Sequence, residues 1–224
     1  MLSDWIKSTF PESAQHALLF LPTQYLSPQP FYDLLKGFEM DLDFTGNDAS
    51  PIKDEEALHT YAARVAGTVA ESCIELAYHH NNDQISGLER AEVVAAGGRM
   101  GIALQYVNIA RDIATDSLIG RVYLPITWLK ECDLTVQDVI NDPHQPNVEA
   151  LRQRLLDLAM EIYKEARPAI EKLPKAARGP MRVAVESYME IGRVLRTKGY
   201  KVKRGRATVP KMRRLRVAWK ALSK

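Results

Sequence analysis

The chain has 224 residues, of which 46% are hydrophobic and 26% are charged, and this composition excludes an intrinsically disordered protein. Its only two cysteines, Cys73 and Cys132, lie far apart, which excludes a disulfide-rich scaffold and gives no zinc-ligand spacing. No run of apolar residues approaches the roughly 20 that a membrane span needs. We therefore expect an intracellular protein that is either cytoplasmic or peripheral to an intracellular membrane.

The net charge of +2 conceals a contrast between the C-terminal tail and the rest of the chain. Residues 191–224 contain 13 of the 30 Lys and Arg residues and no Asp or Glu. A basic tail of this kind can attract nucleic acid, acidic lipid headgroups or a phosphorylated ligand. Its only aromatic residues are Tyr200 and Trp219, and it has no nucleic-acid-reading motif, so we expect no nucleic-acid partner.

Hydrophobic residues recur at spacings of three and four along nearly the whole chain, which predicts helices rather than strands. Breaks rich in Pro, Gly, Asn and Asp divide this pattern into about seven helices and two short helical turns. We expect the turns at 126–131 and 135–141, and the helices at 11–21, 29–42, 54–79, 87–116, 147–171, 175–198 and 208–222. The sequence has no internal repeat, so we predict one all-α domain over residues 1–224 with antiparallel neighbouring helices.

Small residues are concentrated in two of the predicted helices. Residues 62–70 include Gly67 in mid-helix, where Gly costs about 1 kcal/mol relative to Ala. This cost predicts a close approach to the backbone, either by a neighbouring helix or by a bound apolar ligand chain. The second cluster, Gly97, Gly98 and Gly101, lacks the preceding strand and the spacing of a dinucleotide-binding loop, which excludes that function.

The residue types that carry chemistry gather late in the predicted central helix. Asn108, Asp112 and Asp116 are spaced by four, so they form one polar stripe among apolar neighbours. Two carboxylates about 6 Å apart repel by roughly 3 kcal/mol at an effective dielectric constant of 20, and a cation would relieve this repulsion. Carboxylate and amide oxygens suit Mg²⁺, with Arg111 and Arg121 near its phosphate ligands. The alternative is a solvated helix face on which Arg111 pairs with Asp112 or Asp116.

Several motifs together resemble one enzyme family. The pattern Asn-x-x-Arg-Asp-x-x-x-Asp at 108–116, followed by Gly-Arg-Val-Tyr-Leu-Pro at 120–125, resembles the second aspartate-rich motif of squalene and phytoene synthases. The segment 61–69 is similar to a further helix of this family, with Ala in place of its usual Cys at the second position. Segments 37–41 and 177–182 are most similar to the phytoene synthase domain of fungal bifunctional lycopene cyclase/phytoene synthases.

This resemblance implies an all-α, isoprenoid synthase-type bundle. It also implies Mg²⁺-dependent, head-to-head condensation of two geranylgeranyl diphosphates to phytoene through prephytoene diphosphate. The metal ligands it implies are Asn108, Asp112 and Asp116. Residues that bind the diphosphate would be Gln105, Arg111, Arg121 and Tyr188, and the catalytic set would be Asp112, Asp116, Tyr61 and Tyr123. Either tyrosine could instead be an ordinary half-buried residue.

The chain departs from the family pattern in its N-terminal part. Residues 1–60 contain no Asp-x-x-x-Asp helix that could face the second motif, and Asp41 and Asp43 point to different sides of a helix. We therefore expect an N-terminally truncated bundle with impaired activity, whether as a fragment, an incomplete gene model or a chain that has lost activity. The alternative is a catalytically inactive binding or assembly module. The resemblance also implies a fused or partner lycopene cyclase domain. The basic C-terminus predicts peripheral membrane association.

Overall fold

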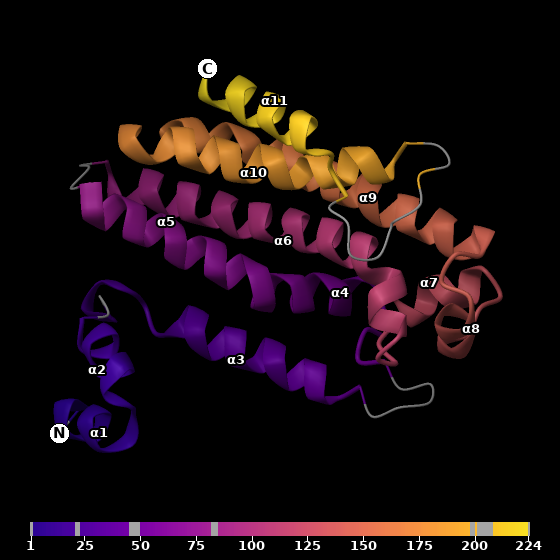
Figure 1. The fold of residues 1–224 in the computed structure, drawn as a ribbon, viewed down its shortest axis with the longest axis horizontal. Coiled ribbons are helices and arrows are strands. Elements are labelled where there is room, and N and C mark those ends of the chain that lie inside the picture. The colour runs from indigo at the N-terminus through magenta and orange to yellow at the C-terminus, as the bar shows by residue number, and fades with distance from the viewer. Residues whose placement is uncertain are drawn as a thin grey trace.

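The computed structural model describes residues 2–20, 23–44, 50–81, 85–197, 200 and 208–223, and none of them lies in a β-strand (Figure 1). The all-α prediction is therefore confirmed for the described residues. The helices are α1 (Leu2–Thr9), α2 (Glu12–Leu19), α3 (Gln29–Leu42), α4 (Glu55–Ala62), α5 (Thr68–Asn81), α6 (Gly87–Ser117), α7 (Ile126–Glu131), α8 (Val136–Asn141), α9 (Pro146–Ala166), α10 (Lys175–Leu195) and α11 (Lys211–Leu222). Two 3₁₀ turns, η1 (Thr23–Tyr25) and η3 (Arg167–Lys172), and a π-helical turn, η2 (Ala63–Gly67), complete these elements.

Helix α6 lies in the middle of the bundle and contacts α5, η2, α9 and α10 (Figure 1). It begins after Ser86, whose hydroxyl oxygen accepts a hydrogen bond from the Glu89 N–H at 3.1 Å and so caps the helix. Its 31 residues give a rod about 47 Å long. Buried side chains occur on several sides of its central turns, including Met100, Tyr106 and Val107, because neighbouring helices surround it.

The close approach predicted at Gly67 is made by α6. A Cβ atom on Gly67 would lie 3.3 Å from the carbonyl oxygen of Gly98, and one on Gly101 would lie 2.4 Å from that of Ala66. Any side chain at Gly101 would therefore force the two helices apart. The neighbouring helix accounts for Gly67, and the predicted helix 54–79 is present as α4, η2 and α5 in succession.

Helices α3 and α11 lie on opposite outer sides of the bundle (Figure 1). Helix α3 packs against η2 and α5, whereas α11 packs along α10. Arg213 of α11 donates a hydrogen bond to Glu190 Oε1 of α10 at 2.5 Å, and Ala221 is buried in the same interface. None of the described helices has the length and apolar character needed to cross a bilayer.

Candidate active site

Four of the predicted site residues meet where α6 faces α10. The Arg111 guanidinium donates to both carboxylate oxygens of Asp112, at 2.8 and 2.5 Å, and also to Asn108 Oδ1. Tyr188 of α10 donates its hydroxyl hydrogen to the same Asn108 oxygen at 2.9 Å. The pairing of Arg111 with Asp112, predicted as the alternative to metal binding, is thus present in this structure. It lies in a half-buried position between helices rather than on a solvated helix face.

Asp116 lies one turn further along α6 and is partly buried. Burial, followed by the negative charge of Asp112, raises the pKa of its carboxyl group to about 7, and the nearby Arg121 and Arg111 offset this effect only in part. A raised pKa means that the protein alone does not fully compensate the ionised carboxylate. A further positive charge at this end of the polar stripe would therefore stabilise the ionised form of Asp116.

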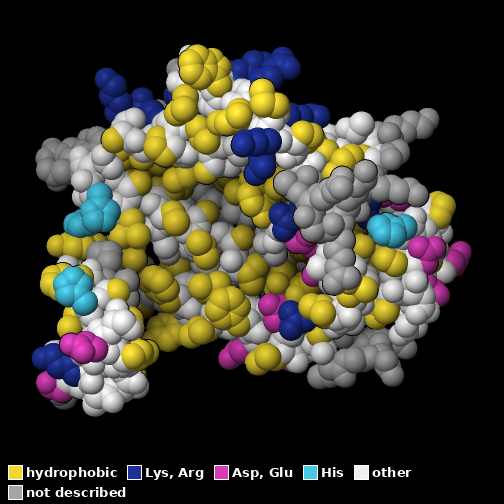
Figure 2. All heavy atoms as spheres, viewed as in Figure 1, with side chains coloured by type: hydrophobic (Ala, Val, Ile, Leu, Met, Phe, Trp, Pro, Cys, Tyr) yellow, Lys and Arg dark blue, Asp and Glu magenta, His cyan; other side chains and the backbone are white. Residues whose placement is uncertain are grey.

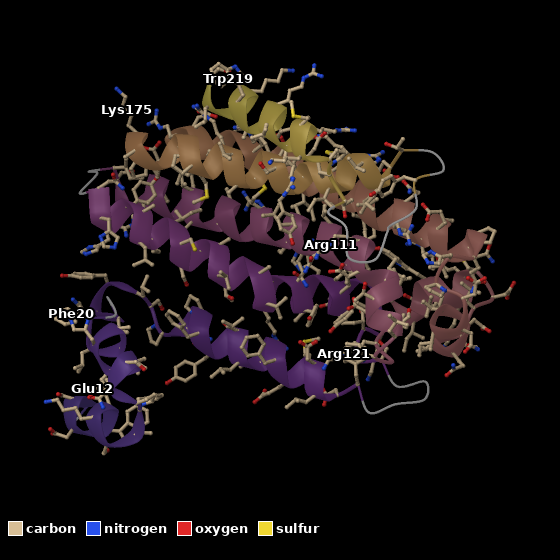
Figure 3. All side chains as sticks on the ribbon, viewed as in Figure 1. Glu12, Phe20, Arg111, Arg121, Lys175 and Trp219 are labelled. Carbon is tan, nitrogen blue, oxygen red and sulfur yellow. The ribbon has the colours of Figure 1, made fainter. Side chains whose placement is uncertain are left out.

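The turn after α6 returns Arg121 to the end of this stripe. Gly120 has a φ of 72°, in the left-handed region that Gly enters without a steric penalty. The Arg121 N–H then donates to the Asp116 carbonyl oxygen at 2.9 Å. Arg121 also donates to the Tyr123 hydroxyl oxygen at 3.3 Å. Figure 3 shows Arg111 and Arg121 at the same end of the bundle.

Asp41, near the end of α3, is a site residue that the sequence does not predict. Its Oδ1 accepts hydrogen bonds from the Tyr61 hydroxyl at 3.1 Å and from the Tyr123 hydroxyl at 2.9 Å. Arg121 donates to the backbone carbonyl of Asp41 at 3.4 Å. Burial is the main cause of the raised pKa of both tyrosines, so their hydroxyl groups remain protonated and can donate. The available sequence signal was the position of Asp41 in a segment that resembles the family.

An open apolar groove of about 380 Å³ lies between η2, α5, α6, η3 and α10. Figure 2 shows the front of the molecule hollowed across its middle and lined largely with hydrophobic side chains. Gln105 and Tyr188 add polar groups to this lining next to the Asn108 end of the stripe. The apolar wall includes Val65, Val69, Ile74, Met100, Leu173 and Val185.

Tyr61 and Tyr123 are not among the residues that line this groove. They lie beside it in a second cluster with Asp41 and Arg121, where their ring centroids are 5.1 Å apart. Asp116 connects the two groups, because it shares a small cavity with Arg121 and Tyr123 and lies within electrostatic range of Asp112 and Asp41. The structure therefore divides the predicted site residues between two clusters. The groove-end cluster contains Asn108, Arg111, Asp112 and Tyr188, and the tyrosine cluster contains Tyr61, Tyr123 and Arg121 together with Asp41.

The oxygen atoms of the polar stripe fit a Mg²⁺ ion in chemical type. Asn108, Asp112 and Asp116 offer hard oxygen ligands, and burial, followed by the negative charge of Asp112, raises the pKa of Asp116. Among the residues that the structure describes, no group of three or more His, Cys, Asp or Glu side chains could hold a metal ion. Further ligands would therefore include water or substrate oxygen atoms, as is usual for Mg²⁺.

The fold defines the class of the protein as an isoprenoid synthase helical bundle. The chain is similar to the crystal structure of a dehydrosqualene synthase in complex with ligand, with a TM-score of 0.75 and 22% identity over 98% of this chain and 74% of that one. It is also similar to a squalene synthase from Alicyclobacillus acidocaldarius, with a TM-score of 0.71 and 20% identity over 90% of this chain and 72% of that one. The predicted fold class is confirmed.

The chain belongs to the squalene/phytoene synthase family, whose family model matches residues 6–213. It is 59% identical over 224 residues to a bifunctional lycopene cyclase/phytoene synthase of Gibberella fujikuroi, covering 100% of this chain and 39% of that protein. The protein of the same description from Leptosphaeria maculans is 55% identical over 222 residues, covering 99% of this chain and 38% of that protein. The chain thus spans less than two fifths of the length of these curated relatives. The predicted family is confirmed.

Proposed function

We propose that this chain provides the phytoene synthase function of a bifunctional enzyme of this kind. It would join two molecules of geranylgeranyl diphosphate head to head and release phytoene, by way of prephytoene diphosphate. The observation that carries this proposal is an apolar groove with polar groups beside a stripe of carboxylates and arginines. A prenyl diphosphate has the matching form, a long apolar chain with a highly charged head.

The polar groups have distinct tasks in this proposal. Asn108, Asp112 and Asp116 would hold Mg²⁺, which supplies charge neutralisation for the departing diphosphate when it is bound. Arg111, which holds Asp112 in this structure, would bind phosphate oxygens with its planar fork of donors. Gln105 and Tyr188 line the groove near the same end and would add neutral hydrogen-bond donors to the diphosphate.

The apolar wall of the groove would protect the reaction from water. Allylic carbocations react with any water that reaches them, so small and aliphatic linings favour rearrangement over hydrolysis. The tyrosine cluster lies beside this wall, and a tyrosine ring stabilises nearby positive charge through its face. Because Asp41 accepts hydrogen bonds from both Tyr61 and Tyr123, it fixes the orientation of their rings.

The chain alone would act weakly in this proposal. Asn108, Asp112 and Asp116 all lie on α6, so they approach a metal from one side only. Residues 1–60 add no Asp-x-x-x-Asp pair from a second helix. The relatives are bifunctional enzymes of which this chain spans 39% and 38%, and a fused lycopene cyclase domain is part of the proposal.

The test is incubation with radiolabelled geranylgeranyl diphosphate and Mg²⁺, both for this chain and for a full-length enzyme that contains it. Asp112→Asn and Asp116→Asn should each lower phytoene formation about 100-fold or more, because each removes a negatively charged ligand of the Mg²⁺ that would neutralise the departing diphosphate. Asp157→Asn is the matched control, since this exposed aspartate of α9 pairs with Arg196 and lies outside the proposed site. A full-length enzyme whose activity survives both substitutions would contradict the proposal.

A further inference from the structure

The outer face of α11 carries a stripe of exposed hydrophobic side chains. Each side chain of this stripe is more than half exposed: Met212, Leu215, Trp219 and Leu222. Their spacing places them on one side of the helix, while Ala221 on the other side is buried against the bundle. Figure 3 shows Trp219 at the outer edge of the molecule. A contiguous exposed apolar surface marks a contact site rather than ordinary solvent-exposed helix.

Cationic side chains border this stripe along one edge. Next to the stripe, in the direction around the helix axis, lie Arg213, Arg216 and Lys220. Helix α11 contains no acidic residue. Arg213 is engaged by Glu190, whereas neither Arg216 nor Lys220 forms an ion pair with any residue that the structure describes. Figure 2 shows hydrophobic side chains flanked by Lys and Arg along this margin of the molecule. The charge of the surface is therefore complementary to an anionic partner.

We propose that α11 docks the protein on the surface of an anionic lipid bilayer. Its 12 residues would lie flat at the interface, with Leu215 and Trp219 among the acyl chains and Arg216 at the lipid phosphates. An apolar stripe that includes Trp and is bordered by cations is the pattern of an interfacial helix. Nucleic acid would use the cations but would leave the apolar stripe exposed to water, so the stripe favours lipid.

Helix α10 connects this surface to the groove. Its inner side lines the groove with Met181, Val185 and Tyr188, and its outer side carries α11. The two helices are in contact, because a Cβ atom on Gly179 would lie at an ordinary contact distance of 3.4 Å from Leu222 Cδ2. Docking through α11 would therefore place one wall of the groove next to the bilayer. The value of placing the groove next to the bilayer rests on the proposed function, because a water-insoluble product would have to enter the bilayer. The docking of α11 itself does not rest on that function.

The test is flotation of the 224-residue chain with vesicles of phosphatidylcholine, alone or mixed with phosphatidylserine. We expect binding to the anionic vesicles that weakens as salt is added. Leu215→Ser with Trp219→Ser should lower the partition coefficient at least about tenfold. Arg216→Gln and Lys220→Gln should each lower it about fivefold. Leu35→Ser with Phe38→Ser on α3 is the matched control, because these residues are similarly exposed and should leave binding unchanged.

Two further measurements keep the result decisive. Circular dichroism must show that every variant retains its helices and its unfolding temperature. In a Trp5→Phe background, fluorescence of Trp219 should shift to the blue on vesicle binding, since the remaining Trp128 is already buried. Docking is overturned if the α11 stripe variant binds vesicles as well as the wild-type chain, or if duplex DNA displaces the vesicles. Asp112→Asn should retain vesicle binding, so a failure of docking and a failure of the proposed catalysis are separable.

Discussion

Helices α3 and α11 lie on opposite outer sides of the bundle, and both expose apolar side chains. On α3 these are Phe31, Tyr32, Leu35, Phe38 and Leu42. The charges beside the two sets differ, because α3 carries acidic residues with a single Lys, whereas α11 carries only basic ones. The inner sides differ as well, since α3 reaches the tyrosine cluster through Asp41 while α11 reaches α10. Exposed hydrophobic surface alone therefore does not specify a partner, and the accompanying charge does.

The largest effect that would sharpen this comparison is expected at Asp41. Asp41→Ala removes the shared acceptor of Tyr61 and Tyr123, so their rings lose their fixed orientation. We expect kcat for phytoene formation to fall about 10- to 100-fold with little change in KM, the loss typical of a positioning residue. Asp41→Asn, which keeps an acceptor oxygen, should recover part of the rate.

Asp43→Ala is the matched control, because Asp43 lies at the exposed end of the same helix. It should leave both kinetic constants unchanged. Equal losses at Asp41 and Asp43 would show that α3 acts only through its general packing. If Asp41 and Tyr123 act through their hydrogen bond of 2.9 Å, the losses in kcat caused by Asp41→Ala and Tyr123→Phe should not add in the double variant. Additive losses would show that the two residues act independently.

Two Gly→Ala substitutions compare how closely α3 and α11 pack against the rest of the bundle. A Cβ atom at Gly37 of α3 would lie 2.7 Å from Val65 Cγ1, so Gly37→Ala should lower Tm by about 2–6 °C through overpacking. At Gly179, against α11, the added atom makes an ordinary contact of 3.4 Å. Gly179→Ala should change Tm by less than about 2 °C, because the gain from replacing Gly within a helix opposes the crowding of a Cβ atom that precedes Pro180. Thermal unfolding followed by circular dichroism measures both variants, and an equal loss of Tm at the two positions would contradict this difference.

A smaller effect is expected at Glu171, which ties η3 to α10. Hydrogen bonds from Arg182 and then Arg167 lower the pKa of its carboxyl group from 4.5 to about 2. Because the pKa is lowered in the folded state, the stabilisation is present above pH 4.5 and is lost as the pH falls towards 2. Glu171→Gln should lower Tm by about 1–2 °C at pH 7, a small value because the carboxylate is partly exposed.

This difference between the wild type and Glu171→Gln should shrink as the pH is lowered from 4.5 to 2. Melting curves at matched ionic strength across this range provide the measurement. A difference that is constant with pH would mean that the carboxylate contributes through packing rather than through its charge.

The helices could be predicted because the signals that begin and end them are local. Helix α7 occupies the predicted residues 126–131, and α10 begins at Lys175, directly after Pro174, as predicted. The prediction omitted α1 (Leu2–Thr9). Helix α10 ends at Leu195, before its predicted end at residue 198, which itself lies outside the described residues.

The site could be predicted only where its residues share one helix. The spacing of Asn108, Asp112 and Asp116 fixes their alignment whatever the tertiary structure. Asp41 could not be found in this way, because its partners Tyr61 and Tyr123 lie 20 and 82 residues away in sequence. Only the packing of α3 against the rest of the bundle brings these groups together.

The outer stripe of α11 was hidden from sequence reasoning for a related reason. The helix has apolar residues on both sides, and its sequence alone does not tell which side a neighbour covers. The structure buries Ala221 and leaves Trp219 exposed. The charge of the tail was therefore evident from the sequence, whereas its apolar surface required the position of α10.

Helix α6 runs without interruption from Gly87 to Ser117, so the glycine contact with η2 and the carboxylate stripe have a fixed orientation relative to each other. One residue inserted between Gly101 and Asn108 would rotate the carboxylates by about 100° relative to the glycine contact with η2. Asp112 and Asp116 would then face a different neighbour, even though no site residue had been replaced. Insertions and deletions in descendants of this sequence should therefore accumulate in turns such as 118–120, while the number of residues in α6 stays constant.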